Sequence, residues 1–460
     1  MQDLKHLSKH NRRIGFSFFN FGRSNRNATR SGERPSPRLY FPTGKYREHL
    51  KRLLVVIAVA LGLIPISLVV IHNSSSIGRE IRSWITRPAV ETKSAEPVKK
   101  LPVSGFITAC SLLDDASGPP DQLTARTVEG ELLHYTIRGD LQKRVHDFLA
   151  KNQVPYGVFV AIEPATGRIL AMTSHSSVDP AWSKNASFDL YPMASLFKII
   201  TASAALESRR ITPETVIEFR GNATSENPRY WDARPKGRNN RTDVTYAMGK
   251  SINPVYGRLA GDIAGKTSVM ASVNKFGFNQ PLLPGTSVKE STAAEPQSSH
   301  GLMLMGAGLD HEVKISPLHA AVMMAAIANG GRMMAPGLTD RVTDRKGADK
   351  ELFVPREIRS LVTPETATSL TRMLSSTVTT GTSRRAFHDR RGRPRLDVEI
   401  AAKTGSINGS DPRGHYSWFA AFAPARNPRI ALVALVINQD KWKIKSAQVG
   451  EQALEEFFGN

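Results

Sequence analysis

A serine and a lysine three residues apart, Ser195 and Lys198, have types and spacing that suit nucleophilic acyl transfer. The mostly apolar run that follows Ser195 predicts a buried helix. Residues at i and i+3 share a helix face, so Lys198 should stand beside the Ser195 hydroxyl. A serine hydroxyl is a poor nucleophile until a neighbouring base takes its proton. A lysine can be that base when desolvation or a nearby cation lowers its pKa.

This pair is weak evidence when it is taken alone. A chain of this length holds about two Ser-x-x-Lys matches by chance, and Ser272 with Lys275 is a second one. The alternative interpretation is that Ser195 caps a helix and Lys198 is solvated. The position at a helix start also favours negative charge that develops near Ser195.

A second candidate segment contains Ser251 and Asn253, which Pro254 follows. An Asn at the N-cap with Pro at the first helical position explains Asn253 structurally, but it leaves Ser251 unexplained. The Ser-x-Asn pattern is common in this chain and also occurs at Ser183, Ser225, Ser272 and Ser406.

A third candidate segment, Lys403-Thr404-Gly405, closes the strand-like run 398–402. Lys-Thr-Gly is expected only about 0.1 times by chance in such a chain. On a strand edge, Lys403 and Thr404 can bind a substrate carboxylate, and Gly405 leaves room for an extended peptide to pair alongside. A Lys403 that converges on Lys198 would also lower the pKa of Lys198. The alternative is an ordinary strand end with a glycine turn.

Strand-like segments lie at both ends of a helical middle region. They predict an α+β domain in which helices cover one antiparallel sheet. The expected strands are 158–162, 169–172, 398–402, 416–422 and 430–437, and the clearest expected helices are 318–329 and 446–458.

Taken in order, the three segments resemble the active-site signature of penicillin-binding transpeptidases and of their serine β-lactamase relatives. The resemblance extends over roughly residues 132–458. It implies a β-lactamase/transpeptidase-like fold, with an antiparallel sheet flanked by helices and an all-helical subregion.

The resemblance also implies a role for each candidate residue. Ser195, Lys198, Ser251 and Lys403 would be catalytic, with Ser251 relaying a proton between Lys198 and the leaving amine. Asn253, Thr404 and Gly405 would bind the substrate, and the backbone N–H groups of Ser195 and Ser406 would form the oxyanion hole.

The implied activity is that of a peptidoglycan D,D-transpeptidase, which cross-links D-Ala-D-Ala stem peptides through a Ser195 acyl-enzyme that β-lactams trap. Two alternatives stay open: a D,D-carboxypeptidase with the same site, and a sensor of β-lactams or peptidoglycan that does not turn over. No cofactor and no metal site is expected, because the chain lacks metal-ligand spacings and its one cysteine, Cys110, allows neither a disulfide nor a cysteine cluster.

Charge is concentrated at the N-terminus of the 460-residue chain, whose formal net charge is +21. Residues 1–52 hold 13 Lys/Arg against 3 Asp/Glu, and the uncharged apolar segment 53–71 follows them. That segment is long enough to cross a bilayer, and its basic flank orients the N-terminus to the cytoplasm. We therefore expect a single-pass anchor in a bacterial inner membrane, with the remainder outside the cytoplasm and no nucleic-acid partner.

The expected organisation is a basic cytoplasmic tail (1–52), a transmembrane signal anchor (53–71), an extracytoplasmic linker or stalk (72–131) and a transpeptidase domain (132–460). The linker is too short for a glycosyltransferase domain, so a separate glycosyltransferase partner is expected. A dense basic run from Arg384 to Arg395 is interpreted as a solvated loop, with attraction to carboxylate-bearing wall peptides or to acidic partners as its functional alternative.

Overall fold

The computed structural model describes residues 99–100 and 103–459. The predicted cytoplasmic tail and the predicted anchor at 53–71 lie outside these residues. Within the described part, no helix combines the length and the apolar character that crossing a membrane requires.

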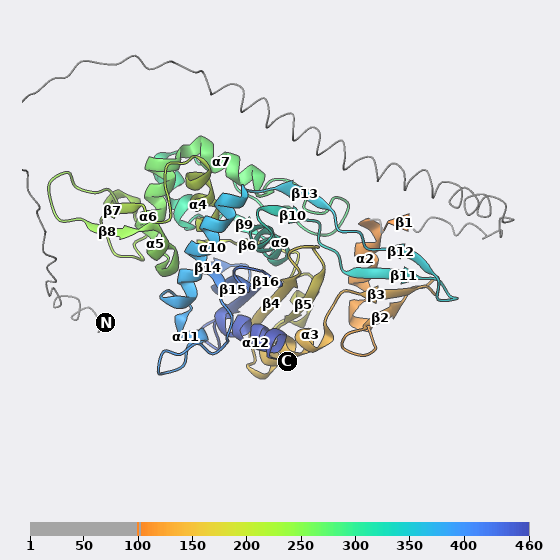
Figure 1. Cartoon of the computed structure of the whole chain (residues 1–460). Coiled ribbons are helices and arrows are strands. Elements are labelled where there is room, and N and C mark those ends of the chain that lie inside the picture. Colours follow the sequence, from red (N-terminus) through yellow and green to blue (C-terminus); the bar gives the residue numbers. More distant parts are fainter. Residues whose placement is uncertain (1–98, 101–102, 460) are drawn as a thin grey trace, which may run out of the picture. The chain divides into compact units, whose positions relative to one another are not determined.

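A five-stranded antiparallel sheet forms the centre of this part of the chain (Figure 1). Its strands run in the order β14 (Ala401–Ser410), β15 (Arg413–Ala423), β16 (Ile430–Asn438), β4 (Tyr156–Ile162) and β5 (Ile169–His175). The predicted hairpin at 158–172 and the two predicted strands at 416–422 and 430–437 are confirmed. Strand β14 lies at one edge of the sheet.

Both faces of the sheet are buried, which explains why its strands read as nearly continuous apolar runs. Along β4, Val158 and Val160 belong to one core cluster, whereas Phe159 and Ala161 belong to the other. The first cluster lies against α4 (Phe197–Glu207), α9 (Pro317–Ala328) and α10 (Pro364–Thr379). The second lies against α3 (Gly139–Lys151) and α12 (Ser446–Phe458). The predicted helices at 318–329 and 446–458 are confirmed.

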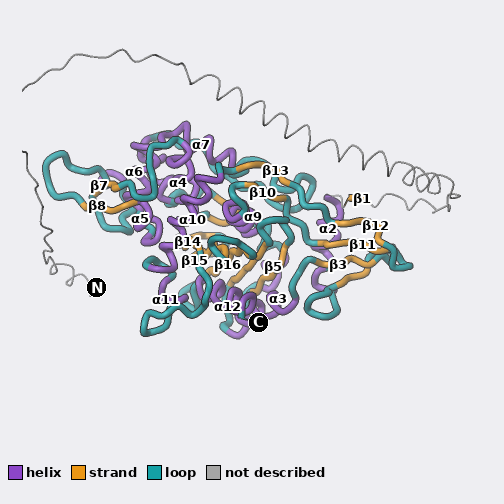
Figure 2. The backbone as a smooth tube through the Cα atoms, viewed as in Figure 1, coloured by secondary structure: helices purple, strands orange, loops and turns teal. Residues whose placement is uncertain are grey.

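The expected helical subregion is present beside the sheet, where Figure 2 shows helices grouped at one end of the domain. It comprises α4, α5 (Val244–Lys250), α6 (Asn253–Arg258), the π-helical turn η5 (Leu259–Ala264), α7 (Gly265–Lys275) and α8 (Ser299–Ala307). The described part also contains three two-stranded sheets. They are β6 (Tyr191–Pro192) with β9 (Lys314–Ile315), β7 (Val216–Phe219) with β8 (Asn240–Asp243), and β10 (Arg332–Met334) with β13 (Glu357–Ser360).

The folded region begins well before residue 132, so the expectation that 72–131 is wholly linker is wrong for its last part. Helix α2 (Val103–Ser111) buries Phe106 and Ala109 in the main core. A second five-stranded sheet follows, in the order β1 (Lys99–Lys100), β12 (Asp349–Leu352), β11 (Thr339–Thr343), β3 (Leu132–Tyr135) and β2 (Thr124–Arg126). This sheet pairs segments more than 200 residues apart, a relation that local periodicity does not reveal.

Candidate active site

Ser195 lies in a single 3₁₀ turn, η3 (Ala194–Leu196), which runs directly into α4. The preceding residue, Ala194, has a left-handed backbone with φ of +52°. Non-glycine residues occupy that region rarely, so the turn before the nucleophile is strained. Ser195 is 9% exposed and sits at the N-terminal end of the helix, where the helix dipole favours negative charge.

Lys198 is completely buried next to Ser195. Its Nζ donates hydrogen bonds to Ser195 Oγ (2.7 Å), Asn253 Oδ1 (2.9 Å) and the Ala307 carbonyl oxygen (2.5 Å). Burial, and then the positive charge of Lys403, hold the pKa of Lys198 well below its usual range. A neutral amine keeps two N–H bonds for Asn253 and Ala307 and turns its lone pair to the serine hydroxyl, which is the arrangement a general base needs.

Ser251 is held by the second buried lysine. It is the left-handed C-cap of α5, with φ of +57°. Lys403 Nζ donates to Ser251 Oγ (2.9 Å) and to the Thr404 carbonyl oxygen (2.7 Å). Burial lowers the pKa of Lys403 to about 7.

The Lys-Thr-Gly segment lies inside β14 and not at the end of a strand, which corrects the predicted position. The run 398–400 precedes the strand, whereas Lys403 and Thr404 pair with Ala420 and Phe419 of β15. The side chain of Thr404 is joined to Thr382 by a hydroxyl–hydroxyl hydrogen bond of 2.5 Å.

Gly405 also allows close packing around the nucleophile. A Cβ at this position would stand 3.2 Å from the Cβ atoms of Ala194 and Trp418. The missing side chain therefore makes room for the turn that carries the nucleophile to pack against β14.

The predicted residues converge on one groove of about 590 Å³. Six of them line it: Ser195, Ser251, Asn253, Thr404, Gly405 and Ser406. Lys198 and Lys403 are completely buried and hydrogen-bonded to the serines of the groove wall. Ser272, the serine of the competing Ser-x-x-Lys match, is buried in α7 and does not line the groove.

Two contributors to the site were not assigned a role from sequence. The Ala307 carbonyl contacts Lys198, and Thr382 contacts Thr404. Both lie far along the chain from their partners, so spacing carries no signal for them.

The N-cap alternative for Asn253 does not hold. Asn253 is the first helical residue of α6 after the N-cap Ile252, and its side chain faces Lys198 and not its own helix end.

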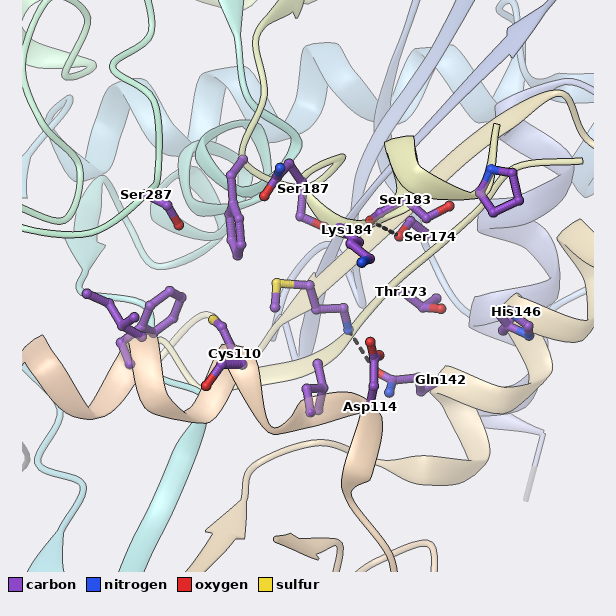
Figure 3. Close-up of a pocket in the computed structure, with 18 residues that line it drawn as sticks. Cys110, Asp114, Gln142, His146, Thr173, Ser174, Ser183, Lys184, Ser187 and Ser287 are labelled. Carbon is purple, nitrogen blue, oxygen red and sulfur yellow. Dashed lines mark hydrogen bonds between the residues drawn. The ribbon is translucent and has the colours of Figure 1, made fainter. Parts of the chain in front are cut away.

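In residues 103–459, no group of three or more His, Cys, Asp or Glu side chains is placed to hold a metal ion. Cys110 lines a separate cavity of about 490 Å³ beside α2, α3 and β5, with Asp114, Gln142 and Ser174 around it (Figure 3). That cavity shares no lining residue with the active-site groove. Burial raises the pKa of Cys110 to about 12, so the thiol stays protonated at neutral pH.

Known proteins resemble this chain in both sequence and fold. The profile of the penicillin binding protein transpeptidase domain matches residues 157–456. The peptidoglycan D,D-transpeptidase PbpA of Mycobacterium tuberculosis (strain ATCC 25618 / H37Rv) is 30% identical over 355 residues, which cover 69% of this chain and 70% of PbpA.

Solved structures give the same result. The crystal structure of PBPA from Mycobacterium tuberculosis matches with a TM-score of 0.61 and 26% identity, over 76% of this chain and 86% of that chain. The imipenem acyl-enzyme complex of penicillin-binding protein A from M. tuberculosis matches with a TM-score of 0.59 and 27% identity, over 71% and 80% of the two chains.

A serine at a helix start, two buried lysines and the edge of an antiparallel sheet define an active-site serine enzyme. Within that class, the chain belongs to the penicillin-binding protein transpeptidase family.

Proposed function

We propose that the chain is a membrane-anchored serine D,D-transpeptidase that cross-links peptidoglycan stem peptides and is acylated by β-lactams. The observation that carries the proposal is the convergence of Ser195, Lys198, Ser251 and Lys403 on one groove. The name of PbpA and the acyl-enzyme complexes of penicillin-binding protein A support the substrate and inhibitor classes.

In the first half-reaction, Ser195 Oγ attacks the carbonyl carbon between the two D-Ala residues while Lys198 takes the hydroxyl proton. The backbone N–H groups of Ser195 and Ser406 stabilise the oxyanion. Ser251, hydrogen-bonded to Lys403, relays the proton that Lys198 has taken to the leaving nitrogen. The C–N bond breaks, D-Ala departs as the amine, and Lys198 is neutral again.

In the second half-reaction, an amine of a neighbouring stem peptide attacks the Ser195 ester and loses its proton to the same base. The new amide forms and the Ser195 hydroxyl is restored. Asn253 and Thr404 orient the peptide, and protonated Lys403 attracts its terminal carboxylate.

Fluorescent penicillin tests the nucleophile in the full chain. Wild type should label covalently, Ser195→Ala should not, and Ser272→Ala should label like wild type because its serine lies outside the groove. Retained labelling of Ser195→Ala would refute the assignment. Product analysis with and without an amine acceptor separates cross-linking from hydrolysis of the terminal D-Ala.

We also propose that residues 53–71 anchor the enzyme in the inner membrane, with the catalytic domain outside the cytoplasm. The uncharged apolar segment and its basic flank support this. Deletion of 53–71 should move penicillin-labelled protein from the membrane pellet to the supernatant, and an unchanged pellet fraction would contradict the anchor. A separate glycosyltransferase is proposed as the partner that polymerises the glycan strands, and co-purification in detergent tests it.

A further inference from the structure

Residues 384–395 carry six arginines on an ordered scaffold. The run begins with α11 (Arg384–Phe387), which contacts both α10 and α12. Phe387 is 2% exposed and stacks on Phe419 of β15 with ring centroids 5.5 Å apart. The returning chain is tied back by a hydrogen bond from Arg395 N to the Phe387 carbonyl oxygen (2.9 Å). The backbone that carries the arginines is therefore held against the domain at both ends of the run.

Two of these arginines line a cavity of about 500 Å³ that adjoins the active-site groove. Arg385 and Arg395 come from the arginine run, and Lys445 comes from the residue before α12. The cavity and the groove share the lining residues Thr382, Lys445 and Ala447. Thr382 is hydrogen-bonded to Thr404. The wall that the cavity shares with the groove is therefore in direct contact with the Lys-Thr-Gly segment of β14.

The cavity carries a surplus of positive charge. In the described part of the chain, neither Arg385 nor Arg395 nor Lys445 takes part in an ion pair, unlike Arg393, which is bonded to Asp389 at 2.8 Å. The one carboxylate in the lining is Glu451, which accepts a hydrogen bond from Gln452 Nε2 (2.9 Å). The N-terminus of α12 lies at the same wall and adds the positive end of its dipole.

We propose that this pocket, lined by Arg385, Arg395 and Lys445, binds an internal carboxylate of a peptide that lies in the active-site groove. The inference rests on the proposed function, which supplies carboxylate-bearing stem peptides as substrates. Guanidinium groups form two parallel hydrogen bonds to a carboxylate, which favours this group as the occupant. The peptide belongs to either the donor or the acceptor strand, since both are stem peptides.

The test measures cross-linking kinetics of the full chain in detergent with synthetic donor and acceptor peptides. Each peptide is supplied with its internal carboxyl free or amidated. For the peptide that occupies the pocket, Arg385→Gln/Arg395→Gln should raise KM by about tenfold in the free-acid form and leave KM of the amidated form unchanged. The peptide that shows the difference identifies the strand.

Arg390→Gln/Arg391→Gln is the matched control, because it removes the same charge from the same loop outside the cavity lining. It should leave KM at the wild-type value. Equal KM rises in both double variants would indicate diffuse attraction and overturn the pocket, as would an unchanged KM for every peptide in Arg385→Gln/Arg395→Gln.

Penicillin labelling separates this inference from the proposed function. Both double variants should label at the wild-type rate, which also shows that they are folded. Absence of both penicillin labelling and cross-linked product in wild type would refute the proposed function. Normal wild-type cross-linking with no KM effect in Arg385→Gln/Arg395→Gln would refute the pocket alone.

Discussion

At the scale of single residues, the site contains two buried lysines whose requirements differ. Lys198 must be neutral to accept the Ser195 proton, and its pKa is lowered by burial and by Lys403. Lys403 attracts a carboxylate only when it is charged, and burial lowers its pKa to about 7. The site is therefore active only in the pH range where Lys198 is neutral and Lys403 is still charged.

The first prediction concerns the pH profile of penicillin acylation. The rate should rise with pH as Lys198 loses its proton and fall above about 7 as Lys403 loses its own, with apparent pKa values that belong to the coupled pair. Lys403→Gln removes the cation that lowers the pKa of Lys198, so the acidic limb should move to higher pH and the alkaline limb should vanish. The maximal rate should fall about 10–100-fold with the lost carboxylate contact. Stopped-flow or gel-based acylation kinetics measures both effects.

Lys250→Gln supplies the control for this profile. Lys250 is an exposed lysine of the same groove, 5.6 Å from the Tyr246 ring centroid. Its substitution should leave both limbs in place. An acidic limb that stays fixed or moves to lower pH in Lys403→Gln would contradict the electrostatic coupling of the two lysines.

The residue types, their order and the resemblance to penicillin-binding transpeptidases together predicted which side chains meet at the site. The helical spacing of Ser195 and Lys198 is local, so it can be derived from sequence. The contacts that complete the site are not local. The Ala307 carbonyl that accepts from Lys198 and the Thr382 hydroxyl on Thr404 are brought in by tertiary packing, which carries no periodic signal.

At the scale of elements, the close contact of α5 with α10 positions two parts of the groove together. Thr382 N donates to the Gly249 carbonyl oxygen at 3.0 Å, two residues before Ser251. A Cβ on Gly249 would stand 2.5 Å from Ser376 Oγ and 2.8 Å from the Ser376 carbonyl oxygen. Only glycine allows the two helices to approach so closely. This close approach determines the positions of both Ser251 and Thr382 in the groove wall.

The second prediction is that Gly249→Ala pushes α5 away from α10. Improved helix propensity contributes about 1 kcal/mol, but overpacking against backbone costs about 1–3 kcal/mol, so the free energy of unfolding should fall. Displacement of Ser251 should slow penicillin acylation about tenfold or more. Chemical denaturation and acylation kinetics measure the two effects.

Gly301→Ala in α8 is a matched substitution without the backbone clash. Its Cβ would meet the Ser298 hydroxyl at 3.3 Å and the Pro296 Cβ at 3.6 Å. This variant should keep wild-type acylation and lower the free energy of unfolding less than Gly249→Ala does. If Gly249→Ala behaves in the same way, the α5–α10 contact does not position Ser251.

Elements with strong patterns were predicted well, and the others were not. The central hairpin and α9 follow from apolar runs between turn residues, and α12 from its helical pattern. Strand β14 was predicted to end at residue 402, because Lys403, Thr404 and Gly405 lack the apolar character of a buried strand. Their pairing with β15 nevertheless makes them part of the strand.

At the scale of the whole described unit, α2 and the second sheet are joined to the catalytic domain by buried contacts. The Tyr135 hydroxyl donates to the Ala109 carbonyl oxygen at 2.9 Å in the interior. Arg138 N donates to the Leu170 carbonyl oxygen at 2.8 Å, which links the segment between β3 and α3 to β5 of the central sheet. The boundary at 132 predicted from composition therefore divides a continuous core, as Phe106 on α2 also shows.

The last prediction compares chains truncated at two boundaries. A chain of residues 95–460 keeps α2 and β2, whereas a chain of residues 132–460 loses Phe106 and leaves the buried Tyr135 hydroxyl without its acceptor. Loss of a Phe-sized buried side chain costs about 3–5 kcal/mol, and the unpaired hydroxyl costs about 1–3 kcal/mol more. The longer chain should show the higher Tm and remain monodisperse, and the shorter chain should aggregate through the exposed edge of β3.

Phe106→Ala in the 95–460 chain tests the same contact when the shorter chain cannot be purified. It should lower the free energy of unfolding by about 3 kcal/mol. Ile107→Ala is its neighbour control, because Ile107 is 44% exposed and its loss should have little effect. Thermal melting of the two variants tests whether α2 contributes to the core. Equal Tm values would mean that α2 contacts the domain surface without contributing to its core. A lower Tm for Phe106→Ala alone would place the start of the catalytic unit at α2, and the linker would then be confined to residues before it.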